Sequence, residues 1–159
     1  MLSESLRPYF EWCGKTWLGA SVRDTIWAFP LIETFHLLAL AVLLGTVLIV
    51  NLRVFGLGRR YAPAEQLARQ LEPWMLASLA ILIASGIPMA FSEPSKCFES
   101  VSFPIKMGLI VLGIVSQFTI QRKWVINGDA NGGKAKIAAA SSIIIWTLVG
   151  AAGKGIPYV

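Results

Sequence analysis

Glu33 and His36 are the side chains whose types and spacing best suit chemistry within a membrane. His36 is the single histidine of the 159-residue chain, and it lies with Glu33 in a long apolar stretch. A separation of three positions places both side chains on the same side of a helix. An ionisable group inside a span is costly, so each one is a functional hypothesis. A histidine is a common ligand of haem iron, and a four-helix bundle is a common scaffold for a cofactor.

Other interpretations of this pair stay open. A neutral His36 could hydrogen-bond to Glu33 or to a hydroxyl on another helix. The Glu-x-x-His spacing also occurs in di-iron carboxylate sites, but those sites need a second such pair and further carboxylates. The predicted second, third and fourth spans contain neither Asp nor Glu. Copper is an alternative cofactor, because Met89 and Met107 are soft ligands expected near the same membrane surface.

The elements that must position these residues are membrane-spanning helices. Hydrophobic residues make up 55% of the chain and charged residues 14%, against roughly a quarter charged residues in soluble domains. A span needs about 20 mostly apolar residues, and four stretches qualify: about 26–52, 73–91, 105–120 and 137–153. Only helices and closed barrels satisfy the backbone in lipid, and these stretches lack the alternation of barrel strands. The sequence therefore predicts an all-α, integral membrane four-helix up-down bundle.

The N-terminal region has a different composition from the rest of the chain. Residues 1–24 are charged and carry amphipathic aromatics such as Tyr9, Trp12 and Trp17, which are typical of headgroup depth. They lack the apolar central run of a secretory signal peptide. We therefore expect an interfacial amphipathic segment over 1–24, followed by a transmembrane domain over 25–159.

Basic residues predict the orientation. Eight of the fourteen Lys and Arg lie in the loops after the first and third spans: Arg53, Arg59, Arg60, Arg69, Arg122, Lys123, Lys134 and Lys136. Such loops face the cytoplasm, so both termini are expected on the outer side of a bacterial cytoplasmic membrane. A short cytoplasmic helix is expected to end at Glu72, before Pro73. Cys13 and Cys97 then share the outer side, where a disulfide can persist.

Several function classes lack their motifs in this sequence. It has no nucleotide-binding glycine pattern, no Cys-x-x-Cys and no arguable Ser-His-Asp combination. The basic loops lie beside the membrane, so they are topology signals and not a nucleic-acid surface. The expected partners are membrane lipids, with a second copy of the chain left open because small residues line several spans. The sequence does not identify a redox partner.

The run from Arg23 to His36, RDTIWAFPLIETFH, resembles the opening of a group of small bacterial four-span membrane proteins that have no settled activity. The resemblance covers about residues 17–124 and continues through Asn51-Leu-Arg53, Pro73-Trp74, Gly86 and Phe103-Pro-Ile-Lys106. More distantly, the chain is similar to CopD-type copper-resistance membrane domains and to HemJ-type protoporphyrinogen oxidases. Both families place a His in an early span and a Lys at the start of a later one, and the HemJ type binds haem b.

The resemblance implies that His36 is an iron ligand and that Lys106 is its charged companion. Arg23 lies on the same side and would join Lys106 near the haem propionates, although both cations could instead snorkel to headgroups. We therefore expect a haem b-binding membrane protein acting in electron transfer or a linked oxidation, with a site drawn from Arg23, Glu33, His36, Met89, Lys106 and Met107. The alternative is a non-redox protein, either a CopD-like copper or solute handler or an assembly subunit of a larger complex. Whether the protein is an enzyme stays open.

Overall fold

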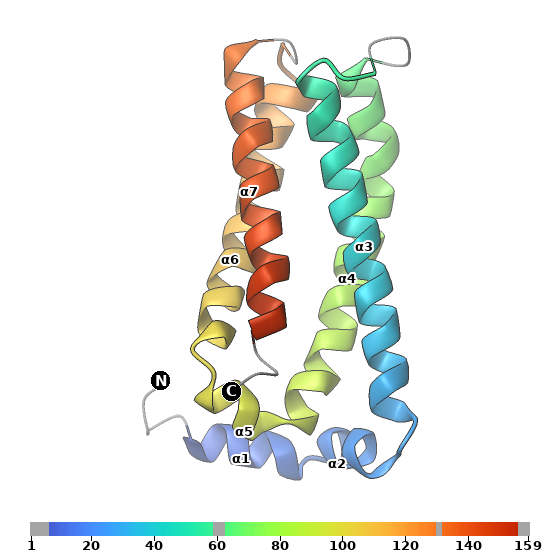
Figure 1. Ribbon diagram of the computed structural model, residues 1–159, viewed down its shortest axis with the longest axis vertical. Helices are drawn as coiled ribbons and strands as arrows, with labels where there is room; N and C mark the ends of the chain where they lie inside the picture. Colours follow the sequence, from blue (N-terminus) through green and yellow to red (C-terminus); the bar gives the residue numbers. More distant parts are fainter. Residues whose placement is uncertain (1–6, 59–62, 130–131, 156–159) are drawn as a thin grey trace.

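The computed structural model describes residues 7–58, 63–129 and 132–155, and this part of the chain is built from helices, with no strand (Figure 1). In chain order the elements are α1 (Arg7–Lys15), α2 (Trp17–Asp24), α3 (Ala28–Val54), α4 (Ala64–Ser92), α5 (Pro94–Glu99), α6 (Ser102–Ser116), the π-helix η2 (Gln117–Ile126) and α7 (Gly133–Gly155).

Four helical stretches are long and apolar enough to cross a membrane: Ala28–Val54, Ala64–Ser92, Ser102–Ile126 and Gly133–Gly153. Each runs antiparallel to the one before it (Figure 1). Helix α4 packs along α3, α6 packs along α7, and α3 also contacts α7. The chain is therefore a multi-pass membrane protein with the predicted all-α, four-helix up-down architecture.

Two of these helices extend into regions that we expected to be loops. Helix α4 begins at Ala64 and continues through Pro73, so the predicted end of a separate helix at Glu72 is wrong. Membrane helices tolerate an internal proline where neighbouring groups or water satisfy the freed backbone carbonyl. The third span likewise continues through η2 to Ile126. As a result Glu72, which we expected at the end of a short cytoplasmic helix, belongs to a membrane-crossing helix, and so does Arg122, which we expected in a cytoplasmic loop.

Three short helices, α1, α2 and α5, lie across one end of the bundle, which we call the capped end (Figure 1). This end presents exposed aromatic side chains: Tyr9, Trp12, Trp17 and Trp27. Amphipathic aromatics prefer headgroup depth, so these residues place the capped end at one membrane surface. Helices α3 and α6 begin here, and α4 and α7 end here.

The opposite end of the bundle, which we call the basic end, carries a group of described cations: Arg53, Arg69, Arg122, Lys123, Lys134 and Lys136. The exposed indole of Trp74 lies on α4 toward this end. It marks a second headgroup level by the same preference.

A row of small side chains runs along one face of α4, and its middle member, Ser85, contacts α3. Ser78, Ser85 and Ser92 are buried and seven positions apart, which puts them on one face of the helix. Each hydroxyl donates to a backbone carbonyl three or four residues earlier. Small residues with satisfied hydroxyls let helix backbones approach in lipid. This row therefore directs Ser85 toward α3 and the histidine that α3 carries.

Candidate functional site

His36 is held against α4 by one hydrogen bond. Its Nδ1 lies 2.8 Å from the Oγ of Ser85, and Ser85 Oγ lies 2.6 Å from the carbonyl oxygen of Ile81. A serine hydroxyl has one proton to donate. The short distance to the Ile81 carbonyl requires that proton to lie between the two oxygens. Ser85 Oγ then accepts a hydrogen bond from the Nδ1–H of His36. The geometry therefore favours the tautomer that leaves a lone pair on Nε2.

The imidazole lies in the capped half of the bundle. His36 is eight residues into α3, or about 12 Å from the start of that helix at 1.5 Å per residue. The ring passes close to the backbone of α4, because a Cβ atom placed on Gly86 would lie 3.5 Å from His36 Cε1. His36 is half-buried. It therefore combines a fixed orientation with a second ring nitrogen, Nε2, that has no hydrogen-bond partner among the described residues.

Lys106 extends from α6 toward α7 near the same end. A Cβ atom placed on Gly153 would lie 3.1 Å from Lys106 Nζ, so the ammonium group rests where α7 has no side chain. Lys106 lies within electrostatic reach of both His36 and Cys97. Among the described residues, no carboxylate forms an ion pair with it. A half-buried, uncompensated cation of this kind suits an anionic group of a ligand.

An apolar groove runs along α3 and α7. Its volume is about 530 Å³, within the range of pockets that hold drug-sized ligands. The lining is Leu40, Leu44, Val47, Leu48, Ile143, Trp146, Thr147, Gly150 and Ala151. Leu40 is one helical turn from His36, and Gly150 is one turn from Gly153, which contacts Lys106. Neither His36 nor Lys106 is part of this lining; the groove ends about one turn from His36 along α3 and about one turn from Gly153 along α7.

The other predicted site residues are Glu33, Arg23, Met107 and Met89, and none of them forms a hydrogen bond with His36 among the described residues. Glu33 is exposed, and in the described part of the chain the histidine bonds to Ser85 and not to Glu33. Arg23 is exposed at the end of α2, where it donates to the carbonyl of Gly14 at 3.3 Å. Met107 is 49% exposed.

Met89 is half-buried on α4. It follows Ser85 by four positions, which places it on the same face of the helix. Of the two predicted sulfur ligands, Met89 is therefore the one that lies on the same face of α4 as Ser85.

A second polar group lies at the basic end, and the sequence analysis did not predict it. The side-chain amide of Gln121 donates to Asn51 Oδ1 at 2.9 Å and to the carbonyl of Ala138 at 3.1 Å. Asn51 and Gln121 are both buried. The two bonds connect α3, η2 and α7 at one point. The available signal was a pair of amide side chains at the predicted span ends, which is too common to single out.

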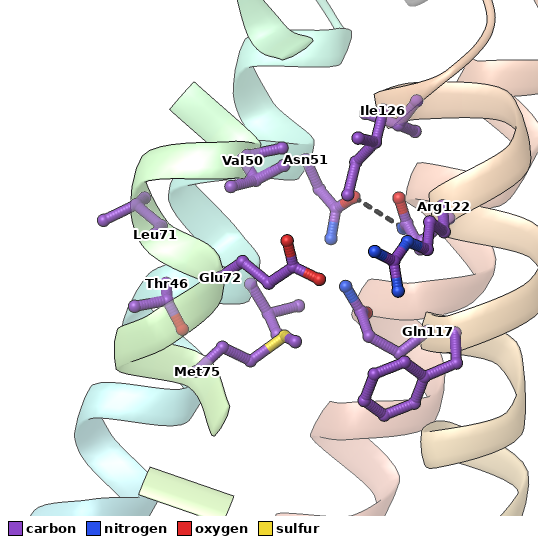
Figure 2. Close-up of a pocket in the computed structure, with 14 residues that line it drawn as sticks. Thr46, Val50, Asn51, Leu71, Glu72, Met75, Gln117, Arg122 and Ile126 are labelled. Carbon is purple, nitrogen blue, oxygen red and sulfur yellow. Dashed lines mark hydrogen bonds between the residues drawn. The ribbon is translucent and has the colours of Figure 1, made fainter. Parts of the chain in front are cut away.

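The π-helix gives this polar group its shape. In η2 the backbone bonds run from i to i+5, so residues four and five positions apart share a side. Gln117, Gln121 and Arg122 therefore face the same cavity, whereas an α-helix would turn Arg122 away from Gln117. Figure 2 shows the Glu72 carboxylate of α4 pointing toward Arg122 and Gln117 from the other side.

Comparison with known proteins identifies a family but no activity. A family model described as a family of unknown function, DUF6644, matches residues 9–159. No curated protein and no solved structure matches the chain. These comparisons therefore give no support to the more distant resemblance to CopD-type and HemJ-type proteins.

Proposed function

This chain belongs to the DUF6644 family, a family of unknown function. From its own residues we propose that it is a haem b-binding membrane protein acting in electron transfer or a linked oxidation. The observation that supports this proposal is the hydrogen bond between His36 Nδ1 and Ser85 Oγ. Metal-ligating histidines usually donate their other ring N–H to a fixed acceptor, which sets the tautomer and the ring orientation. Ser85 fits that role for His36.

The surroundings of His36 also fit this group. The apolar groove of about 530 Å³ between α3 and α7 suits the faces of a porphyrin, and Lys106 would hold a propionate at its capped end. Met89 would be a candidate for a second protein ligand of such a group. Bound haem would supply one-electron chemistry at its iron, while the protein residues orient it and exclude water.

A visible spectrum tests the proposal directly. The protein is produced in a haem-competent host and purified in detergent, and the pyridine haemochrome identifies the haem type. We expect a Soret band in the wild type, its loss in His36→Ala, and its retention in Glu33→Gln, a matched change of a polar but exposed residue on the same helix. A wild type without a Soret band after haem supplementation would overturn the proposal, as would His36→Ala with undiminished haem.

Copper is the second candidate, and it rests on the same nitrogen together with the thioether of Met89. Within the described residues there is no cluster of three or more His, Cys, Asp or Glu side chains, so a copper site here would depend on few ligands. Metal analysis of the same purified sample separates the two candidates. Copper at one equivalent per chain without a Soret band would favour a CopD-like copper handler, and a sample with neither would favour an assembly or solute-handling role.

We further propose that the protein lies in the bacterial cytoplasmic membrane with its basic end in the cytoplasm, following the positive-inside rule. Thr25 at the capped end and Lys134 at the basic end are both exposed. Thr25→Cys and Lys134→Cys are introduced separately into a chain without Cys13 and Cys97. A membrane-impermeant maleimide should label intact cells at position 25 only. Labelling at position 134 only would reverse the orientation.

A further inference from the structure

Glu72 and Arg122 present opposite charges to one small cavity at the basic end (Figure 2). The cavity has a volume of about 30 Å³ and lies among α3, α4 and η2. Within the described part of the chain, neither side chain forms an ion pair or a hydrogen bond. Facing walls of opposite charge suit a ligand that carries both charges itself.

Both charged groups lie at the level of the lipid headgroups. Trp74, two positions after Glu72 on α4, is 64% exposed and marks the headgroup level at this end. Because α4 begins at the basic end, Glu72 lies about 3 Å farther toward the aqueous side than Trp74, at 1.5 Å per residue. Arg122 is exposed on η2, four positions before that helix ends at Ile126. Lipid headgroups, and not acyl chains, therefore surround the helices at this pair.

The helix surfaces just below this pair are apolar and open to lipid. Leu76 follows Glu72 by four positions on α4, and Phe118 precedes Arg122 by four positions on η2, so both lie deeper in the membrane. Their side chains are 39% and 40% exposed, and Phe118 also lines the cavity. Lipid tails are as apolar as these side chains. A lipid with its headgroup at the charged pair thus has apolar surface for its acyl chains directly beneath.

The volume of the cavity selects the group that can enter it. A water molecule needs about 10–15 Å³ of such volume, so about 30 Å³ admits a group the size of one or two waters. A primary ammonium group is of this size. A trimethylammonium group and a phosphate are both larger, and they would not fit without movement of the helices.

The lining offers acceptors to an ammonium group, and Arg122 offers donors to a phosphate. The Glu72 carboxylate points into the cavity (Figure 2). The hydroxyl of Thr46, which lines the cavity, donates to the Leu43 carbonyl at 2.8 Å and keeps its lone pairs for accepting. The side-chain amide of Gln117 supplies a further carbonyl oxygen. The planar guanidinium of the exposed Arg122 matches the oxygens of a phosphate.

We propose that this cavity binds the headgroup of a membrane phospholipid whose phosphate carries a primary amine. The ammonium group enters the cavity against Glu72, the phosphate stays outside on Arg122, and the acyl chains lie along Leu76 and Phe118. A free aminoalkyl phosphate has the same polar chemistry, but the exposed apolar surface beneath the pair favours a lipid. This site lies at the opposite end of the bundle from His36, and the proposal does not depend on haem.

The neighbouring charged pair on α4 provides a matched control. Arg69 bonds to Glu65 at 3.2 Å and to the carbonyl of Ile126 at 3.2 Å. Glu65 and Arg69 are not part of the cavity lining. They are the same residue types at the same end of the bundle, but they form a direct ion pair and share no cavity with Glu72.

Native mass spectrometry of the delipidated protein in detergent tests the proposal. Phosphatidylethanolamine, its N-methyl and N,N-dimethyl derivatives and phosphatidylcholine are added separately, all with the same acyl chains. We expect one phosphatidylethanolamine per chain, bound about tenfold or more tightly than phosphatidylcholine, because a charge-assisted hydrogen bond is lost with the methyl groups. The two intermediate lipids should fall between these limits. Equal affinity across the series would overturn the proposal, and this comparison needs no variant to fold.

Two variants separate the roles of the two charges. Glu72→Gln should abolish the preference for phosphatidylethanolamine and leave the affinity for phosphatidylcholine unchanged. Arg122→Gln should weaken both lipids by a similar factor, because both carry the phosphate, and it should keep the preference. Glu65→Gln and Arg69→Gln should change neither property. A loss of preference in Glu65→Gln as large as that in Glu72→Gln would contradict recognition at the cavity.

Two further ligands test the assignment to an amine-bearing lipid. Phosphatidylglycerol is anionic and has no amine, so tighter binding of this lipid than of phosphatidylethanolamine would mean that the basic end attracts anionic lipids by charge alone. Free phosphoethanolamine should not displace the bound lipid at equal concentration, because it lacks acyl chains. Either tighter binding of phosphatidylglycerol or full displacement by the free headgroup would reject the proposed lipid site.

Discussion

His36 Nδ1 and Ser85 Oγ lie 2.8 Å apart across the interface between α3 and α4. The same hydroxyl lies 2.6 Å from the Ile81 carbonyl, so its single proton is directed to α4 and its lone pairs face the histidine. This one contact fixes both the position of the imidazole and the nitrogen that is free for a ligand.

Ser85→Ala should weaken haem binding about tenfold to a hundredfold, which is the usual effect of losing the group that orients a metal-ligating histidine. Haem titration of the purified variant measures this. Ser78→Ala is the matched control, because Ser78 occupies the same row and makes the same kind of backbone bond, to Met75, away from the histidine. Equal affinities in the two variants would show that Ser85 does not orient the ligand.

Lys106→Met should lower haem retention about tenfold or more, since hydrogen bonds to charged groups contribute about 1.5–3 kcal/mol. Lys106→Arg should restore most of it by keeping the charge. Both variants are compared by Soret absorbance after equal washing in detergent. Full retention by Lys106→Met would mean that the ammonium group only snorkels toward the headgroups.

Gln121→Leu should lower the free energy of unfolding by about 1–3 kcal/mol, because it leaves the buried Asn51 Oδ1 without its donor. The double variant Asn51→Leu, Gln121→Leu should lose less than the sum of the two single variants, because no unpaired amide remains. Unfolding in detergent, followed by circular dichroism, measures these differences. Thr119→Ala, an exposed change on the same π-helix, is the control, and strict additivity would contradict a direct interaction.

Cys97 should react slowly with a maleimide at neutral pH and faster as the pH rises. Burial raises the pKa of the Cys97 thiol, the carboxylate of Glu93 raises it further, and Lys106 opposes both effects. The reactive thiolate is therefore scarcer at pH 7 than for an ordinary cysteine. Glu93→Gln should increase the rate at a given pH, and Lys106→Met should decrease it. Cys13→Ser removes the other thiol from the assay, and both cysteines are free in the structure.

The sequence by itself determined the class of this protein and the approximate position of its spans. Apolar length and the need to satisfy the backbone in lipid are properties of about 20 consecutive residues, so they can be read without knowing any contact. The same logic singled out His36 and Lys106, since an ionisable group within or beside an apolar run is conspicuous.

Only the tertiary structure decided which groups these residues meet. Ser85 is 49 positions from His36, and Gln121 is 70 positions from Asn51. Such pairs depend on the rotation of each helix about its own axis, and the local sequence of a helix does not determine that rotation. Glu72 was expected to end a short cytoplasmic helix and Arg122 to lie in a loop. They line one cavity because α4 continues through Pro73 and η2 turns as a π-helix. Helix continuation and helix rotation are settled by packing between helices, and the sequence of any one helix does not contain that information.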